Sequence, residues 1–190
     1  MKLFLALLAG CSLLAGCSSL PLAPRPARDQ LRDFALEARF VLRAPGADGS
    51  TQSASGRLDW MHQNGEDKIL IANPIGFSLA EIEIGTTHAS LRTGDGRQFA
   101  ATDPDALLQE AIGQSLPVRQ LAPWLLGQPG PGGQLTRDKL GRPLHLNEAN
   151  WDIDYFYDEE QADSLPSRLH LRQPPATELR LRIEEWKAHP

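Results

Sequence analysis

The chain has two cysteines, Cys11 and Cys17, and both lie close to its N-terminus. The thiol of a cysteine can be acylated, oxidised to a disulfide or bound to a metal. Because no cysteine follows residue 17, the rest of the chain has no disulfide framework. Thiol catalysis and cysteine-ligated metal sites are excluded there for the same reason. The chemistry of the cysteines therefore belongs to the N-terminal segment.

Residues 1–16 have the three-part layout of a secretory signal peptide. Lys2 supplies a positive charge, residues 3–14 form an apolar run, and two small residues precede Cys17. The run is too short to cross a bilayer, since about 20 apolar residues are needed. We therefore expect residues 1–16 to be removed and Cys17 to begin the mature chain.

The four residues Leu14-Ala15-Gly16-Cys17 resemble the lipobox of bacterial lipoproteins, in which the cysteine receives a diacylglyceryl group on sulfur and an acyl chain on its amine. Leu8-Ala9-Gly10-Cys11 matches the same pattern, but cleavage there leaves less than the roughly 7–15 apolar residues of a signal. Three acyl chains at Cys17 would make attachment permanent. By resemblance to enterobacterial lipoproteins, Ser18 favours the outer membrane. We expect a lipid-anchored protein on its periplasmic face.

The charge balance argues against nucleic acid as a partner. Without residues 1–16 the chain keeps 18 of its 19 basic residues against 24 acidic ones, a net charge of −6. Nucleic-acid binding depends instead on clustered lysine and arginine. The 174 remaining residues suit a single domain, which we expect to be monomeric. We assign residues 17–33 to the lipidated cysteine, a proline-rich tether and a short helix, and residues 34–190 to the folded domain.

Period-two alternation of apolar and polar residues dominates the domain and predicts β-strands. Leu36 and Phe40 alternate with Glu37 and Arg39 in the first strand, for example. Asn64-Gly65 is a strong hairpin signal, because both residues tolerate positive φ. The last strand should bulge or end near residues 184–185, where the alternation shifts. The ten predicted strands cover residues 35–43, 56–61, 68–72, 79–84, 89–92, 98–101, 143–146, 151–157, 168–172 and 177–183.

Two helices interrupt the strands in the middle of the chain. The first is predicted for residues 104–112, with Asp103 as its N-cap and Gly113 after its end. The second covers residues 118–126 and contains Pro123, which must kink or divide it. Both carry an apolar stripe, so each should cover a sheet.

Two further segments complete the prediction. A short helix is expected at residues 29–34, and residues 127–133 contain too many glycines and prolines for anything but a loop. The whole chain is then mainly β with a few helices, an α+β fold. We expect an open antiparallel half-barrel of about ten or eleven strands, enclosing a hydrophobic cavity that the helices cover.

Seven short motifs, in order along the chain, resemble the LolB family of outer-membrane lipoproteins. No single motif is decisive, but seven in this order are hard to obtain by chance. The resemblance covers roughly residues 34–186 together with the lipobox. The motifs are Gly56-x-Leu58-x-Trp60, Asn73-Pro74-Ile75-Gly76, Gly113-x-x-Leu116-Pro117-Val118, Leu121-x-x-Trp124-Leu125-x-Gly127, Trp151-x-Ile153-x-Tyr155, Leu165-Pro166 and Ile183-x-x-Trp186.

The resemblance implies a half-barrel whose cavity takes the acyl chains of a lipoprotein handed over by the periplasmic carrier LolA. It implies no cofactor, nucleotide, metal or covalent chemistry, and hence no enzyme. Each candidate for the cavity lining could equally be ordinary core packing. The candidates are Leu36, Phe40, Leu58, Trp60, Leu70, Ile82, Ile84, Leu91, Phe99, Leu107, Ile112, Leu121, Trp124, Leu171 and Leu181.

A sharper candidate site lies between the third and fourth predicted strands. Pro74 cannot donate to a sheet ladder and Gly76 permits a tight turn, which places Ile75 at a loop tip. The resemblance implies that this residue, a leucine in the family, protrudes and inserts the cargo into the lipid of the outer membrane. Isoleucine is equally apolar, so the role is retained.

Two rival functions stay open from the sequence. A structural or assembly lipoprotein would have a packed interior and no cavity. An envelope hydrolase would need convergent polar groups, and the sequence offers no such set. The five histidines lack paired metal-ligand spacing. The acidic residues at 152–160 lack the spacing of a calcium loop, so a solvated face or a docking surface for a basic partner is the better interpretation.

Overall fold

The computed structural model of the chain describes residue 28 and residues 31–46, 48–112 and 116–187. The predictions for the signal peptide, for Cys17 and for the tether lie outside these residues, as does Gly113. The described residues contain eleven strands and two helices.

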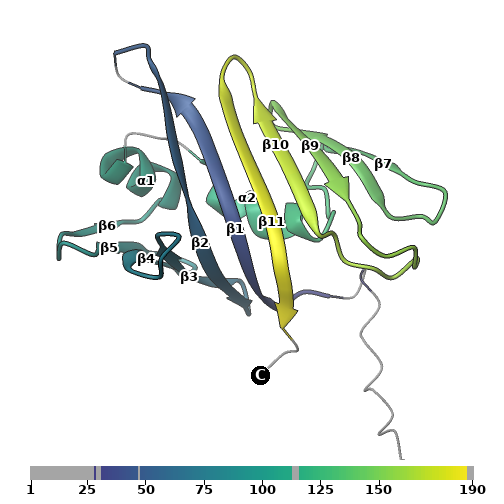
Figure 1. Cartoon of the computed structure of the whole chain (residues 1–190), viewed down its shortest axis with the longest axis horizontal. Helices are drawn as coiled ribbons and strands as arrows, with labels where there is room; N and C mark the ends of the chain where they lie inside the picture. Colours follow the sequence, from purple (N-terminus) through teal and green to yellow (C-terminus); the bar gives the residue numbers. More distant parts are fainter. Residues whose placement is uncertain (1–27, 29–30, 47, 113–115, 188–190) are drawn as a thin grey trace, which may run out of the picture.

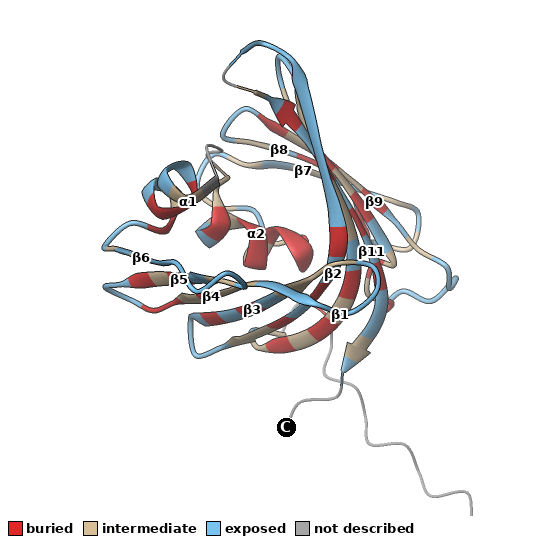
Figure 2. Ribbon diagram, turned by 60° about the vertical axis from the view of Figure 1, so that its left-hand side comes forward, coloured by how far each residue is buried: buried red, intermediate tan, exposed pale blue. Residues whose placement is uncertain are grey.

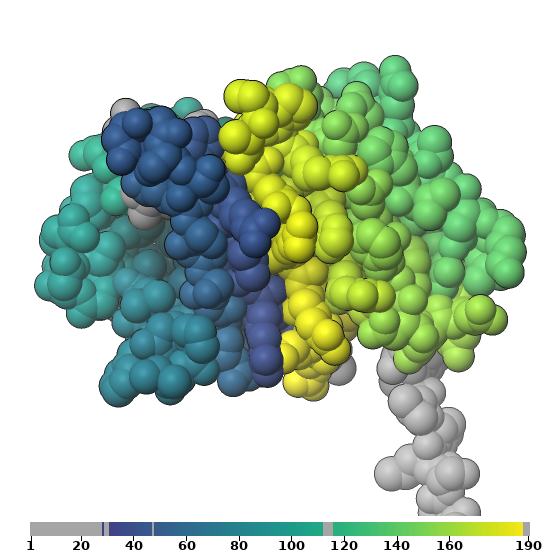
Figure 3. Space-filling view, turned by 45° about the horizontal axis from the view of Figure 1, so that its top comes forward, coloured from purple at the N-terminus to yellow at the C-terminus, as the bar shows by residue number. Residues whose placement is uncertain are grey.

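Eleven strands form one antiparallel sheet in the order β6-β5-β4-β3-β2-β1-β11-β10-β9-β8-β7. β1 pairs with β11, so the two ends of the domain lie side by side in the middle of the sheet (Figure 1, Figure 3). β6 and β7 are its two edges, and the sheet is open. The strands are β1 Phe34–Pro45, β2 Thr51–Gln63, β3 Glu66–Ala72, β4 Ser78–Ile84, β5 Ala89–Thr93, β6 Gln98–Ala101, β7 Gln134–Arg137, β8 Pro143–Glu148, β9 Trp151–Phe156, β10 Arg168–Gln173 and β11 Thr177–Lys187.

The two helices, α1 (Pro104–Ile112) and α2 (Val118–Leu125), lie inside the curve of the sheet (Figure 2). Asp103 caps α1, because its Oδ1 accepts a hydrogen bond of 3.1 Å from the backbone N–H of Asp105. Pro123 lies inside α2 without dividing it. Both predicted helices are confirmed.

Alternation along the strands sorts the side chains between the two faces of the sheet. In β1, Phe34, Leu36 and Ala38 are buried on the concave face, whereas Arg39 and Arg43 are exposed on the convex face. The concave residues and the helices share one hydrophobic core. The convex face is the more exposed one, as Figure 2 shows by its pale blue outer bands, and it carries charged residues such as Arg39 and Arg43.

The bulge predicted near residues 184–185 is confirmed. Ala38 lies opposite Ile183 and Glu37 lies opposite Glu185, so Glu184 has no residue opposite it. A bulge of this kind keeps the strand paired while it shifts the alternation. Trp186 consequently returns to the concave face, beside Leu36.

Two local predictions are wrong. The helix expected at residues 29–34 is absent from its described part, because residues 31–33 have no regular structure and Phe34 begins β1. The ring of Phe34 packs 5.6 Å from that of Trp60, and this tertiary contact favours the strand. The second error is an omission, since β7 (Gln134–Arg137) has no clear alternation and was not predicted.

Candidate functional site

The loop of residues 73–77 joins β3 to β4, and we refer to it as the β3–β4 loop. Its backbone closes on itself, because the N–H of Asn73 donates to the carbonyl of Phe77 over 2.9 Å. The N–H of Gly76 donates to the carbonyl of Asn73, also over 2.9 Å. Gly76 has φ of 96°, a conformation that favours glycine. The loop is therefore a tight, defined turn.

The side chain of Asn73 completes the hydrogen bonding of this loop. Its Oδ1 accepts from the N–H of Ile75 over 3.1 Å and from the N–H of Phe77 over 2.9 Å. Pro74 has no N–H, so every backbone donor of the loop is satisfied within it. Such a loop can enter apolar surroundings without exposing bare donors, which are costly there.

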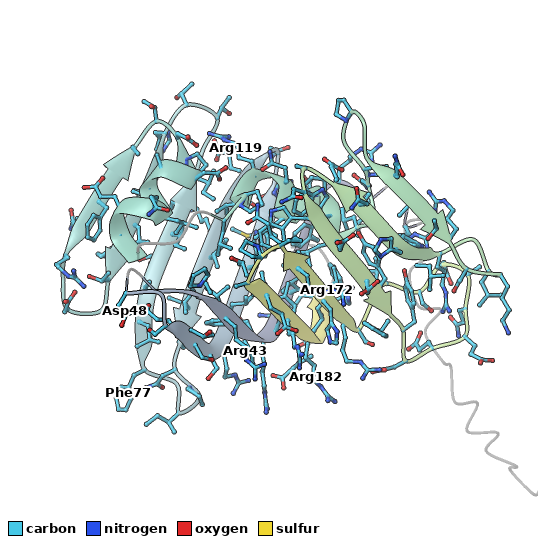
Figure 4. The ribbon with its side chains drawn as sticks, turned by 90° about the horizontal axis from the view of Figure 1, so that it is seen from above. Arg43, Asp48, Phe77, Arg119, Arg172 and Arg182 are labelled. Atoms are coloured by element: carbon cyan, nitrogen blue, oxygen red, sulfur yellow. The ribbon has the colours of Figure 1, made fainter. Side chains whose placement is uncertain are left out.

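The apolar side chains of the loop point into solvent. Ile75 is 80% exposed and Phe77 is 69% exposed, and the nearby Leu70 and Leu79 are also exposed. Figure 4 shows Phe77 extending away from the body of the domain. The structure thus places Pro74, Ile75 and Gly76 at a loop tip, as predicted. Phe77 belongs to the predicted loop but was not among the residues expected to insert, although a second apolar residue beside the turn was a usable signal.

Most of the predicted lining residues gather on the concave face. They come from the sheet and from both helices, and all are below 10% exposed and belong to one cluster. Phe40 and Phe99 are partly buried and pack against that cluster. The fully buried members are Leu36, Leu58, Trp60, Ile82, Ile84, Leu91, Leu107, Leu121, Trp124, Leu171 and Leu181.

Leu70 was wrongly assigned to the interior. It is 41% exposed on the convex face, and its neighbour Ile69, at 6%, points inward instead. The reason is Asp67, which is two residues before Ile69 and is buried although it is charged. Because Asp67 is a polar residue on the buried face, the apolar and polar residues of β3 do not alternate clearly in the sequence. The side chain of Ile112 lies outside the described residues.

Asp67 is a buried polar group that sequence reasoning missed. Its Oδ1 lies 2.8 Å from Nε1 of Trp60 and 2.6 Å from Nδ1 of His62. Trp60 donates its indole N–H to this carboxylate, which fixes the orientation of the ring in the core. Asp67 thereby orders one wall of the apolar interior.

Two hydrogen bonds hold α2 over the interior. The Oη of Tyr155 donates to the carbonyl of Trp124 over 2.7 Å, and burial raises the pKa of this phenol. The N–H of Val118 donates to Oδ1 of Asp105 over 3.1 Å, which ties α2 to α1, and burial raises the pKa of Asp105. The Nε1 of Trp124 is buried without a hydrogen-bond partner. The two helices thus cover the interior, and few hydrogen bonds hold them there.

Two hollows lie on the convex face. One, of about 410 Å³, is lined by residues of β4, β5 and β6, among them Glu81 and Arg92. The other, of about 370 Å³, is lined by residues of β1 to β4 that include Lys68 and Leu70.

Within the described part of the chain, no helix is long and apolar enough to cross a membrane. The same part holds no cluster of three residues suited to a metal ion.

Comparison with known proteins shows the family of this chain. The family model "Outer membrane lipoprotein LolB" matches residues 32–186. This chain belongs to the LolB family. An outer-membrane lipoprotein LolB from Dechloromonas aromatica is 48% identical over the full length of both chains. Another, from Azoarcus sp., is 35% identical and covers 96% of this chain and 93% of its own.

A solved structure shares the fold of this LolB family member. The LolA superfamily protein from Nitrosomonas europaea aligns with a TM-score of 0.50 at 12% identity, over 86% of this chain and 90% of its own. Membership of the LolB family supports a role in the localisation of outer-membrane lipoproteins and identifies the chain as a lipoprotein of that membrane. Both LolB relatives are named as outer-membrane lipoproteins.

Proposed function

We propose that this chain is the outer-membrane acceptor of acylated lipoproteins. It takes them from a periplasmic carrier of the LolA type and inserts them into outer-membrane lipid, without ATP or metal. The observation that carries the proposal is the β3–β4 loop, which leaves Ile75 80% exposed while the backbone N–H groups of the loop are satisfied within it. In this proposal residues 1–16 are removed, the acyl chains on Cys17 hold the acceptor at the membrane, and residues 34–190 are the binding domain.

The first step is binding of the acyl chains of the cargo in the apolar interior. Leu107 of α1 and Trp124 of α2 are fully buried against the concave face, so the packed interior is the unloaded state. Acyl chains would replace these helix contacts with contacts of their own. Exchange of one apolar surface for another requires little net free energy, whereas exposure to water costs about 25 cal/mol per Å².

Transfer between the carriers then follows their relative affinities. Each 1.4 kcal/mol by which the acceptor binds more tightly shifts the partition about tenfold. No energy source is needed if the acceptor site is the tighter one. The acyl chains finally pass into the lipid bilayer, because it is the most extensive apolar phase available to them.

The last step is insertion, and the loop supplies it. Burial of Ile75 and Phe77 in the bilayer would stabilise contact by about 1.5–3 kcal/mol for each side chain. The N–H groups of the loop stay satisfied by Asn73 during entry. The loop would thus bring the loaded interior against the lipid.

The test replaces Ile75 with glutamate in cells that depend on this chain. We expect cargo lipoproteins to accumulate in the periplasm, because a charge at the tip opposes entry into the bilayer. Leu144→Glu is the matched control, since Leu144 is 48% exposed on β8, away from the loop. Normal delivery of cargo in the Ile75→Glu cells would show that the loop does not insert.

A second function is favoured by one observation, the packed interior. A structural or assembly lipoprotein would keep Leu107 and Trp124 buried permanently. A fluorescent fatty-acid probe distinguishes the two functions. Binding of the probe with a change in tryptophan fluorescence supports the acceptor, and absence of binding supports the structural protein.

A further inference from the structure

Four arginines lie directly opposite one another on four neighbouring strands of the convex face. In the registers of the sheet, Arg57 of β2 lies opposite Arg39 of β1, Arg39 opposite Arg182 of β11, and Arg182 opposite Arg168 of β10. We call these four residues the arginine row. Residues directly opposite in an antiparallel pair have Cβ atoms about 4.5–5.5 Å apart, and like charges there are destabilising. The stability of the sheet therefore does not by itself explain why arginines occupy these four positions.

Carboxylates neutralise only part of the arginine row. Glu184 contacts two members, Arg39 over 2.7 Å and Arg57 over 3.4 Å. Asp158 lies 3.7 Å from Arg168. The side chain of Arg182 makes no ion pair or hydrogen bond with any residue in the described part of the chain. Glu37 also interacts with Arg57, but it pairs with Lys187 over 2.7 Å. Because Glu184 is shared by two arginines and the side chain of Arg182 has no carboxylate partner in the described part of the chain, the row keeps positive charge that is exposed to solvent.

The surroundings of the row are also positive in a chain that is acidic as a whole. The strands β1, β2, β10 and β11 carry eight arginine or lysine residues against five acidic ones, a net charge of +3. The whole chain has a formal net charge of −5. Positive charge is therefore concentrated in the middle of the sheet.

The arginine row leads directly to the β3–β4 loop. Arg57 lies opposite Ala72, which is the last residue of β3 before the loop begins. Figure 4 shows Arg43, Arg182 and Phe77 projecting to the same side of the molecule, whereas Arg119 lies on the opposite side. A flat surface that meets the apolar loop thus also meets the guanidinium groups.

We propose that the arginine row is a docking surface for the phosphate groups of the anionic membrane lipid into which the β3–β4 loop inserts. This inference rests on the proposed function. Guanidinium groups bind phosphate oxygens in a bidentate geometry, and the weak hydration of the group favours such contacts at an interface. The row sets the orientation of the convex face on the bilayer, and the loop supplies apolar anchorage beside it.

The test measures binding of residues 18–190 to lipid vesicles by co-sedimentation. The strands, helices and hydrophobic core that the structure describes all lie within residues 31–187, so this chain keeps the fold without its lipid anchor. One set of vesicles is phosphatidylcholine, and the other contains about one third phosphatidylglycerol as the anionic lipid. The variants are Arg182→Gln and the double variant Arg39→Gln/Arg182→Gln.

On anionic vesicles we expect affinity to fall about fivefold for Arg182→Gln and about 25-fold for the double variant, because each basic residue near such a surface contributes about 1 kcal/mol. Arg182→Lys should keep most of the binding. Arg119→Gln, on the opposite side, should leave it unchanged. Unaltered thermal unfolding excludes a folding defect. An equal loss on both kinds of vesicle, or no loss on either, overturns the proposal.

Two further readouts separate this proposal from the acceptor function. Ile75→Glu should weaken binding to both kinds of vesicle, so its failure to do so counts against the loop and not against the row. Acceptance of cargo from the carrier in solution, without vesicles, should be normal in the arginine variants. If that acceptance is lost while vesicle binding persists, the row docks an acidic protein and the lipid assignment is wrong.

Discussion

The indole Nε1 of Trp60 donates a hydrogen bond of 2.8 Å to the carboxylate of Asp67, which is 4% exposed. His62 lies directly opposite Asp67 in the pairing of β2 with β3, and its Nδ1 is 2.6 Å from the same oxygen. One buried acid thus joins two rings of the neighbouring strand. This pairing stabilises the end of the interior beside the turn between β2 and β3, at the opposite end of β3 from the β3–β4 loop.

Asp67→Ala should lower the free energy of unfolding by about 2–4 kcal/mol, because it leaves the buried N–H of Trp60 without an acceptor. Urea unfolding followed by tryptophan fluorescence measures the change. Asp59→Ala is the control, since Asp59 is on the neighbouring part of β2 with its side chain 52% exposed. Equal stability of the two variants would show that the buried carboxylate contributes nothing specific.

Asn73→Ala should disorder the β3–β4 loop with little effect on global stability. The substitution removes the acceptor for the N–H groups of Ile75 and Phe77, at less than about 1 kcal/mol each in an exposed loop. Insertion of cargo into vesicles should fall several-fold, because bare donors would enter the bilayer. Asn73→Asp keeps the acceptor and should restore a defined loop in solution. Full insertion activity in Asn73→Ala would refute this role.

The stability of the domain should decrease as the pH rises above about 10, the pKa of an unfolded tyrosine. Burial raises the pKa of Tyr157 to about 12, and its Oη donates to the carbonyl of Pro143 over 2.8 Å. A pKa that is higher in the folded state gives stability that is complete below pH 10 and is lost as the pH passes 12. Urea unfolding at several alkaline pH values measures the slope. Tyr157→Phe should reduce the slope without abolishing it, because burial also raises the pKa of Tyr155, and an unchanged slope contradicts the assignment.

Gly127→Ala should destabilise the fold at the end of α2. Gly127 has φ of 66°, and a Cβ built on it lies 2.1 Å from Cγ of Pro143, which begins β8. We expect a loss of about 2–4 kcal/mol from backbone strain and overpacking together. Gly65→Ala provides the comparison, because Gly65 has φ of 77° but no atom within 4 Å of the added Cβ. A difference of zero between the two variants would mean that the contact with Pro143 relaxes freely.

Local patterns in the sequence determined most of the secondary structure. The alternation of β1 and β11, the cap Asp103 and the shift at Glu184 all depend on residues close in the chain, and all are found where they were predicted. The loop of Pro74, Ile75 and Gly76 belongs to the same class, because a proline and a glycine act on their own backbone. Such features follow from local physical chemistry.

Tertiary structure decided the features that depend on residues far apart in the chain. Leu70 was assigned to the wrong face because the inward position of Asp67 depends on Trp60, a residue of another strand. Phe34 joins a strand because its ring packs against Trp60. The arginine row likewise exists only in the registers of β2, β1, β11 and β10. The spacing of residues in the sequence does not predict those registers, because packing between distant parts of the chain determines them.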